Sequence, residues 1–394
     1  MSSCKLILFC IQSIQVTPES ELSFNAPIEA LEGEIYPNFA LAYDGHGLQF
    51  AGMGKEFLEN HPEAKRYYDL AQEVLGYDIL DKCMNGPKED LNRTELAQPA
   101  IVAYNLAAYH ALRQTLPEQM EIAPTVIAYQ SLGLLNAMHR SGMFGDPESD
   151  EAINSVIKLS AIRRKLMQEA SDSVDGGMWL LSSARKGGGL PSRRVKKIFN
   201  KASQVYAVNG VTPAIERNSA QTVISGLVSD FDKVNQKYGK KLKEDYGIVA
   251  IRLPGACGPF HSEYMQSAAD GLREEISSWD LLDPAIPIQS NSSPVRDLEK
   301  KDEVIEELIE GITGVVKGPQ MIDNIYEKGL SMFEVGEKML IGDTMVFDER
   351  FHEGKKIPVK KIAAVGGGIA VVLGSAAAAY FIRRKRADDK GEVV

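Results

Sequence analysis

Cysteine is scarce in this chain, and no two cysteines are spaced for metal or disulfide chemistry. The 394 residues include four cysteines, Cys4 and Cys10 near the N-terminus and Cys83 and Cys257 standing alone, with no Cys-x-x-Cys pair. This pattern excludes a zinc site built on paired cysteines and argues against a disulfide framework. We therefore expect no metal site and a reducing, cytoplasmic setting for the globular part.

A basic stripe and a secretion signal are also lacking. The net charge is -10, and no face-forming run of lysine and arginine stands out within the globular part. Nucleic acid is therefore not an expected partner, because phosphate neutralisation needs a basic face. The N-terminal apolar run, residues 6–11, is shorter than a signal-peptide core of roughly 7–15 residues. Hydrophobic residues make up 44% of the chain, enough for one large and one smaller domain.

Long uncharged runs are absent except near the C-terminus. Residues 362–382 carry no charge and reach the length of about 20 residues that crosses a bilayer. Lysines precede the run, and four consecutive basic residues, 383–386, follow it at the start of the tail 383–394. We expect a transmembrane helix here, reached through a polar linker at 346–361. A buried Gly/Ala-rich helix is the alternative, and the equal basic flanks leave its orientation open.

One serine stands where an apolar strand meets a helix. Residues 124–129 form a short, β-rich apolar run that leads into Gln130-Ser131-Leu132-Gly133 and then an apolar helix. A strand, a turn with serine and a helix expose a nucleophile at the top of a parallel sheet. Ser131 is therefore a candidate nucleophile, although a serine in this place can also be a simple helix N-cap.

Acyl transfer through a covalent intermediate would need three further groups, and the sequence offers a candidate for each. His261, in a Pro-Phe-His-Ser turn, could be the base, or a structural histidine. Arg163 is a cation on an otherwise apolar helix and could bind an acid, or form a surface ion pair. The turn Gly45-His46-Gly47 could aim backbone N–H groups at an anion, or merely connect strand to helix.

The middle of the chain changes its pattern. Between residues 171 and 252 the order of expected elements is βαββαβ, which is that of a ferredoxin-like unit. It interrupts an α/β pattern, so it is interpreted as an insertion. The expected strands are 178–184, 205–208, 222–226 and 247–253, and the expected helices are 192–202 and 230–242.

Seven sequence blocks in order make the chain from residue 38 to about 342 resemble the malonyl-CoA:acyl-carrier-protein transacylase family. Each block alone is weak, but the common order is specific. The blocks are Tyr43-Asp44-Gly45-His46-Gly47-Leu48-Gln49, Thr94-Glu95-Leu96-Ala97-Gln98-Pro99-Ala100, Gln130-Ser131-Leu132-Gly133, Arg163 with Leu166-Met167-Gln168, Asn218-Ser219 with Val223-Ile224-Ser225-Gly226, Gly258-Pro259-Phe260-His261-Ser262, and Phe333-Glu334-Val335-Gly336.

The resemblance implies an α/β fold. Its large domain is α/β-hydrolase-like with a parallel sheet, and a ferredoxin-like small domain is inserted in it. With the C-terminal features, the expected organisation is an extension at 1–36, the large domain at 37–170 and 253–345, the small domain at 171–252, the linker at 346–361, the transmembrane helix at 362–382 and the tail at 383–394.

The resemblance also implies a mechanism. His261 takes the proton of Ser131, whose oxygen attacks malonyl-CoA, and an acyl carrier protein then accepts the malonyl group on its phosphopantetheine thiol. Backbone N–H groups of His46 and Leu132 hold the oxyanion, and a backbone carbonyl orients the histidine. Arg163 pairs with the free carboxylate of malonate. The remaining substrate-binding residues implied are Phe260, Asn218 and Gln130.

The expected role is therefore in fatty-acid or polyketide biosynthesis. The CoA thioester is a substrate, and no cofactor is implied. Because malonyl-CoA is the donor, the globular part should face the cytoplasm while the C-terminal span anchors it to the membrane.

Several residues at the site depart from the family pattern. Tyr129 replaces the first glycine of the nucleophile turn, and Gln130 replaces the family's histidine. Leu134 stands for a glutamate, and Gly311 for a glutamine that helps position substrate. A second hypothesis follows, a catalytically impaired module that binds a carrier protein or synthase at the membrane. A thioesterase using the same acyl-enzyme is a third and weaker one.

Overall fold

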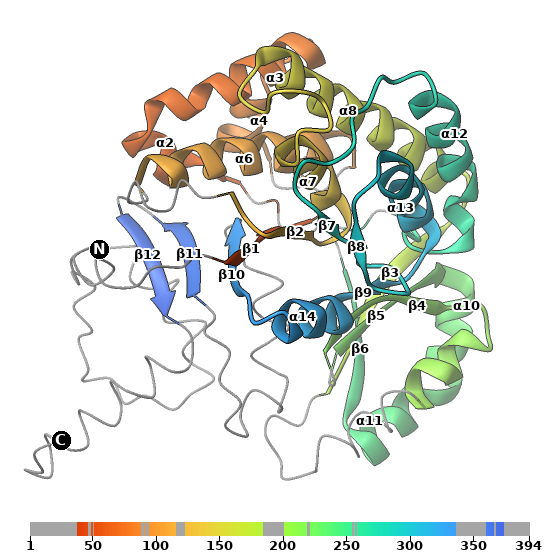
Figure 1. The fold of residues 1–394 in the computed structure, drawn as a ribbon. Helices are drawn as coiled ribbons and strands as arrows, with labels where there is room; N and C mark the ends of the chain where they lie inside the picture. The colour runs from red at the N-terminus through yellow and green to blue at the C-terminus, as the bar shows by residue number, and fades with distance from the viewer. Residues whose placement is uncertain are drawn as a thin grey trace, which may run out of the picture.

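The computed structural model describes residues 38–45, 49, 51–87, 91, 94–115, 123–183, 201–218, 221–253, 256, 258–335, 360–365 and 368–373. Two five-stranded sheets organise most of them (Figure 1). We call them the central sheet and the ferredoxin-like sheet. The predicted extension at 1–36 and tail at 383–394 lie outside the described residues.

The central sheet has the order β10-β1-β2-β7-β8. Its strands β10, β1, β2 and β7 run parallel, and β8 pairs antiparallel with β7. Every residue of β1 and β2 is buried, as expected for apolar strands that are covered on both faces. The strands are β1 (Phe39–Tyr43), β2 (Val126–Tyr129), β7 (Ile288–Gln289), β8 (Asp297–Leu298) and β10 (Ser331–Val335).

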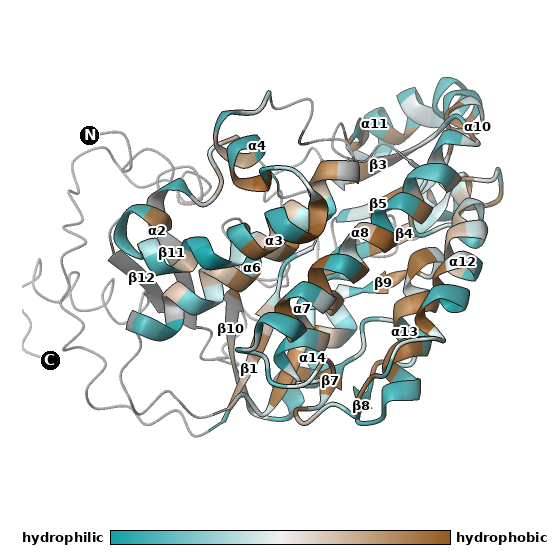
Figure 2. Ribbon diagram, turned by 90° about the horizontal axis from the view of Figure 1, so that it is seen from above, coloured by the Kyte–Doolittle hydropathy of each residue, from teal (hydrophilic) through white to brown (hydrophobic). Residues whose placement is uncertain are grey.

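Alternation along β1 divides the core into two layers. Phe39, Leu41 and Tyr43 pack into the main core with most of the helices, whereas Ala40 and Ala42 pack against α14 (Gly318–Glu327) on the other face. In Figure 2 the helices alternate between teal and brown along their turns, as amphipathic helices do. The helices beside the main core are α2 (Lys55–Asn60), α3 (Arg66–Leu75), α4 (Ile79–Asn85), α6 (Thr94–Thr115), α7 (Leu134–Arg140), α8 (Asp150–Asp172), α12 (Gln266–Ile276) and α13 (Lys301–Thr313).

The ferredoxin-like sheet has the order β6-β3-β5-β4, and β9 extends it beyond β4. The first four strands pair antiparallel, and this order is that of the predicted ferredoxin-like unit. Strand β9 comes from the chain after α13 and pairs parallel with β4. The elements are β3 (Gly176–Ser183), β4 (Thr212–Asn218), β5 (Gln221–Leu227), α10 (Val228–Val234), a π-helical turn η5 (Asn235–Gly239), α11 (Lys240–Tyr246), β6 (Ile248–Arg252) and β9 (Val316–Lys317).

The strand predicted at 205–208 is wrong. Residues 201–207 are helical, and the strand follows at β4 after a turn at Gly210, whose φ is +88°. Ala202 and Tyr206 are spaced by four and are both buried in the core of this region. Burial on one helical face therefore overrides the strand preference of the local Val-Tyr-Ala-Val sequence.

The C-terminal segment also differs from the prediction. Within the expected helix 362–382 the structure has an antiparallel pair of strands, β11 (Lys360–Val365) and β12 (Gly368–Leu373). The many β-branched residues of these two stretches favour strands over helix. The rest of the expected helix lies outside the described residues. Within the described ranges, no helix combines the length and the apolar character that crossing a membrane requires.

Candidate active site

Ser131 lies at the carboxyl end of β2, where η4 (Ser131–Gly133), a single 3₁₀ turn, leads into α7. Its φ is +48°, and that of His261 is +57°. Among the residues that the structure describes, these are the two non-glycine residues with a positive φ. Each such conformation costs about 1–3 kcal/mol, so the surrounding structure must enforce it. The two strained residues are the predicted nucleophile and its base.

Backbone-to-backbone packing holds the nucleophile turn. The Gln130 N–H donates to the Tyr43 carbonyl at 2.9 Å. A Cβ added to Gly133 would lie 2.4 Å from the Tyr43 oxygen, and one added to Gly45 would lie 2.1 Å from the Gln130 oxygen. Only glycine fits at these two positions, and this is the physical reason for two glycines of the sequence blocks.

His261 meets Ser131 directly. Its Nε2 lies 3.0 Å from the Ser131 Oγ, and its Nδ1 lies 3.0 Å from the carbonyl oxygen of Gly314. Because a carbonyl can only accept, Nδ1 carries the hydrogen and Nε2 is left to accept from the serine hydroxyl. The His261 backbone N–H donates to the Ile312 carbonyl at 3.1 Å. The carbonyls of Ile312 and Gly314, at the C-terminal end of α13, thus hold the backbone and the imidazole of His261 in place.

The imidazole is held neutral. Burial, and after it the positive charge of Arg163, lower the pKa of His261 to about 4, although the carbonyls of Gly314 and Gly311 oppose the shift. A neutral imidazole at physiological pH can accept the proton of Ser131. The pair therefore has the geometry and the protonation state of a nucleophile with a general base.

Arg163 is a buried cation without an acidic partner. It is 4% exposed on α8, and its Nη1 donates to Gln98 Oε1 at 2.7 Å. Among the described residues its Nε has no hydrogen-bond partner, and no carboxylate pairs with the guanidinium. Burial lowers its pKa to about 10, so it stays charged. Such a group is suited to a ligand carboxylate, which would compensate the buried charge.

The structure describes some of the other predicted site residues and not others. Leu132 and Phe260 are buried, each next to a member of the Ser131–His261 pair in sequence. Gln130 is half-buried, and its Oε1 has no partner among the described residues. Asn218 ends β4, but its side chain lies outside the description, as does all of His46.

Sequence reasoning missed three contributors. Gln98 sits in a quoted block but received no role, and it holds Arg163. Gly314 supplies the carbonyl that orients His261. Glu307 is a buried carboxylate hydrogen-bonded to Tyr129, directly before the nucleophile turn. For Glu307, the only signal in the sequence was the departure from the family pattern at Tyr129, because a glutamate on an amphipathic helix is usually solvated.

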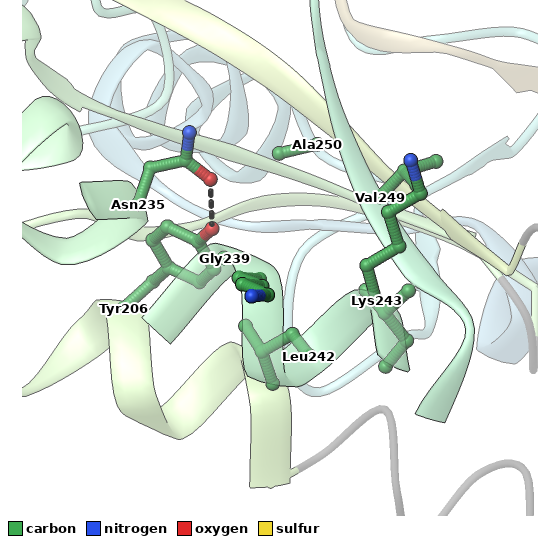
Figure 3. A pocket seen from close by; sticks show the side chains of 9 residues that line it. Tyr206, Asn235, Gly239, Leu242, Lys243, Val249 and Ala250 are labelled. Atoms are coloured by element: carbon green, nitrogen blue, oxygen red, sulfur yellow. Dashed lines mark hydrogen bonds between the residues drawn. The ribbon is translucent and has the colours of Figure 1, made fainter. Parts of the chain in front are cut away.

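A cavity of about 230 Å³ lies elsewhere, on the ferredoxin-like region (Figure 3). Its wall includes Tyr206, whose hydroxyl donates to Asn235 Oδ1 at 3.3 Å. Neither Ser131 nor His261 lines it. As for metals, no cluster of three or more His, Cys, Asp or Glu that could hold an ion occurs in the described part of the chain.

The sequence of this chain is similar to those of known proteins. A model of the acyl transferase domain matches residues 41–310. The chain is 31% identical over 305 residues to the malonyl CoA-acyl carrier protein transacylase of Bacillus subtilis (strain 168), covering 77% of this chain and 88% of that protein. It is 28% identical over 295 residues to a probable mitochondrial malonyl-CoA-acyl carrier protein transacylase of Drosophila melanogaster, covering 73% and 72%.

A solved structure is similar as well. The malonyl CoA-acyl carrier protein transacylase from Coxiella burnetii superimposes with a TM-score of 0.67 at 25% identity, covering 83% of this chain and 95% of that one. The family model's range of 41–310 includes strands of both the central sheet and the ferredoxin-like sheet.

Proposed function

This chain belongs to the acyl transferase domain family, within its malonyl-CoA:acyl-carrier-protein transacylases, and on that premise we propose that it moves a malonyl group from malonyl-CoA to the phosphopantetheine thiol of an acyl carrier protein. The matches confirm the resemblance that the seven sequence blocks predicted. The single observation that carries the proposal is the 3.0 Å contact between Ser131 Oγ and His261 Nε2.

The proposed reaction has two halves. First, Nε2 of His261 takes the hydroxyl proton while Ser131 Oγ attacks the thioester carbonyl. The tetrahedral intermediate collapses, the C–S bond breaks, and CoA leaves as a thiol with the proton from the imidazolium. Second, His261 takes the proton of the carrier's phosphopantetheine thiol, whose sulfur attacks the seryl ester. Ser131 then leaves and recovers that proton, so the enzyme is regenerated.

Oxyanion stabilisation is assigned to backbone N–H groups of Leu132 and His46. Leu132 directly follows the nucleophile in η4, where a turn into a helix leaves N–H groups without helical acceptors. Removing one such donor from an enzyme of this kind costs about 10²–10³ in rate.

Arg163 is proposed to select the malonyl group. Its buried, acid-free guanidinium would pair with the free carboxylate of the substrate. Phe260, buried next to His261, would crowd a larger α-substituent, and Gln130 and Asn218 would complete the substrate contacts. Arg163→Ala should lose the preference for malonyl-CoA over acetyl-CoA, because an unpaired carboxylate is unfavourable in a buried site.

The mass of the intact protein after incubation with malonyl-CoA tests the proposal. The unchanged chain should gain one malonyl group, and Ser131→Ala should gain none. Adding a carrier protein should then remove the adduct and malonylate the carrier. An unlabelled, folded protein, under conditions that label the Bacillus subtilis relative, would overturn it. Release of free malonate without a carrier would instead favour the thioesterase hypothesis.

The alternative is an impaired module that binds a carrier protein or synthase. Departures from the family pattern at Tyr129, Gln130, Leu134 and Gly311 favour it, because they cluster around the nucleophile turn and on the helix that orients the base. It requires Ser131→Ala to keep carrier binding and biological role intact. A loss of that role in Ser131→Ala would rule the module out.

Membrane attachment is a separate proposal that rests on the uncharged sequence 362–382 and its basic flanks, and not on a helix, since residues 360–365 and 368–373 form strands. With malonyl-CoA as donor, the globular part would face the cytoplasm. Fractionation of the full chain against a chain that ends before Lys355 tests it. Recovery of the full chain in the detergent-free supernatant would exclude the anchor.

A further inference from the structure

Tyr129 makes a buried hydrogen bond directly beneath the nucleophile. It is the last residue of β2, two positions before Ser131, and its side chain is 1% exposed. Its hydroxyl donates to Oε1 of Glu307 on α13. Burial, and then the charge of Glu307, raise the pKa of Tyr129 well above its usual value, so the hydroxyl remains a donor. The side chain that replaces the family's glycine is thus bonded to a carboxylate.

Glu307 is satisfied entirely by hydrogen-bond donors. It is 6% exposed, and besides Tyr129 it accepts from the backbone N–H of Asn291 at 2.9 Å and of Ser292 at 3.1 Å, and from the Ser292 hydroxyl. Asn291 Nδ2 in turn donates to the Tyr129 carbonyl at 3.2 Å. Because its donors come from the end of β2 and the exit of β7, the carboxylate ties these two segments to α13.

The groups that hold the base lie at the end of the same helix, Ile312 in its last turn and Gly314 directly after it. Ile312 and Gly314, whose carbonyls bond the His261 backbone and Nδ1, follow Glu307 by one to two helical turns. A helix is stiff over that length, so fixing Glu307 against β2 also fixes these carbonyls relative to Ser131. Reaction between the two groups depends on sub-ångström placement.

We propose that Tyr129 and Glu307 are positioning residues, which keep the strand that carries the nucleophile in register with the helix that orients the base. This inference rests on the proposed function, since it takes Ser131 and His261 as the reacting pair. Tyr129, which stands where the family has glycine, would then support the site and not impair it. A buried side-chain bond does what a close backbone approach at glycine would otherwise do.

The test uses the full-length chain and the reaction of Ser131 with phenylmethylsulfonyl fluoride, followed by intact mass. This reagent reports the activated serine without needing an acyl-CoA substrate. Tyr129→Phe and Glu307→Gln should each slow sulfonylation about tenfold, the effect of losing a charge-assisted hydrogen bond. In malonyl transfer, kcat should fall by a similar factor while KM stays within about twofold. The double variant should be no slower than the worse single one, because both remove the same bond.

Two matched variants control for general destabilisation. Tyr206→Phe deletes another buried tyrosine hydroxyl bond, that to Asn235, far from the serine. Glu303→Gln alters another carboxylate on α13, in its first turn. Both should react within twofold of the unchanged chain. The proposal is overturned if Tyr129→Phe and Glu307→Gln also react within twofold, if Tyr206→Phe slows as much as they do, or if their losses simply multiply in the double variant.

Two readouts, sulfonylation and malonylation of Ser131, distinguish a failure of the proposed substrate from a failure of the positioning role. If the unchanged chain is sulfonylated at Ser131 but never malonylated, the proposed substrate fails while the positioning pair is still judged by sulfonylation. If the unchanged chain is malonylated and the two variants are as fast, the positioning role alone fails. If the unchanged chain reacts with neither reagent, both fall together.

Discussion

The two sheets of this molecule are stabilised in different ways. Around the ferredoxin-like sheet the core is aromatic, with the rings of Trp179 and Phe231 stacked at 4.0 Å and Tyr206 beside them. Of the buried polar side chains in the described part of the chain, Ser225 is the one on that sheet. The others, and both strained non-glycine residues, lie in the central sheet, in its helices or in the turns that connect them.

The region with the aromatic core therefore differs from the region that carries the proposed reaction. Buried polar groups oppose folding unless each has its hydrogen-bond partner, and a serine or histidine whose backbone has a positive φ opposes it as well. An apolar, aromatic core has no such requirement and stabilises by area alone. The central sheet is therefore where small changes should abolish reaction, and the ferredoxin-like sheet is where they should lower stability first.

The largest effect is expected at the base. His261→Ala should slow malonylation of Ser131 by about 10²–10⁴-fold, since general base catalysis contributes that much. Single-turnover labelling by intact mass measures it. His110→Ala, which removes a part-buried histidine on α6, is the control and should keep its rate. A loss of less than tenfold in His261→Ala would contradict the assigned role.

A change at the nucleophile turn should cost stability as well as activity. Gly133→Ala places a Cβ 2.4 Å from the Tyr43 carbonyl oxygen. Overpacking of this kind costs about 1–3 kcal/mol of the free energy of unfolding.

Gly311→Ala is the matched control, because a Cβ at Gly311 meets nothing within 4 Å and helical alanine gains up to about 1 kcal/mol. Urea unfolding compares the two. Equal unfolding midpoints would show that the backbone contact at Gly133 is not tight.

On the other sheet the opposite pattern is expected. Phe231→Leu disrupts the stack with Trp179 and should lower the free energy of unfolding by about 1–2 kcal/mol. Sulfonylation of Ser131 should remain near the unchanged rate at a temperature where the protein is folded. A loss of reactivity as large as that of His261→Ala would break the separation between the two sheets.

The subtlest effect concerns pH. The pKa of His261 is about 4, so sulfonylation should fall only as the pH drops through that value, where the imidazole becomes protonated. Burial is the main cause and Arg163 the next. Arg163→Met should therefore move this acidic limb upward, toward but not reaching the usual histidine value. Lys165→Met, on the exposed side of the same helix, should leave the limb unchanged. An unmoved limb in Arg163→Met would show that the two groups are not coupled.

The sequence could predict the contacts that depend on backbone pattern. Ser131, His261 and Arg163 are brought into one site because each block fixes a strand end, a turn or a helix face. The order of the ferredoxin-like sheet followed from the alternation of strands and helices in the same way.

The failures at 201–207 and at Glu307 depended on partners distant in sequence. The helix at 201–207 was taken as strand because its local preference is overridden by burial of Ala202 and Tyr206. Glu307 is indistinguishable from a solvated glutamate until the exit of β7 supplies its N–H donors. The uncharged run at 362–382 suits a helix by length, but two of its stretches belong to strands.

The short stretch that follows α13 has a mechanical consequence. Gly314 orients His261, and only three residues later Lys317 donates its N–H to Asn291 at 2.6 Å and its Nζ to Glu216 at 2.6 Å. Strand β9 within this stretch belongs to the ferredoxin-like sheet. A rotation that separated the two sheets would thus pull on the carbonyl that aims the imidazole. The connection between the two sheets and the carbonyl that orients the imidazole therefore lie in one short segment of the chain.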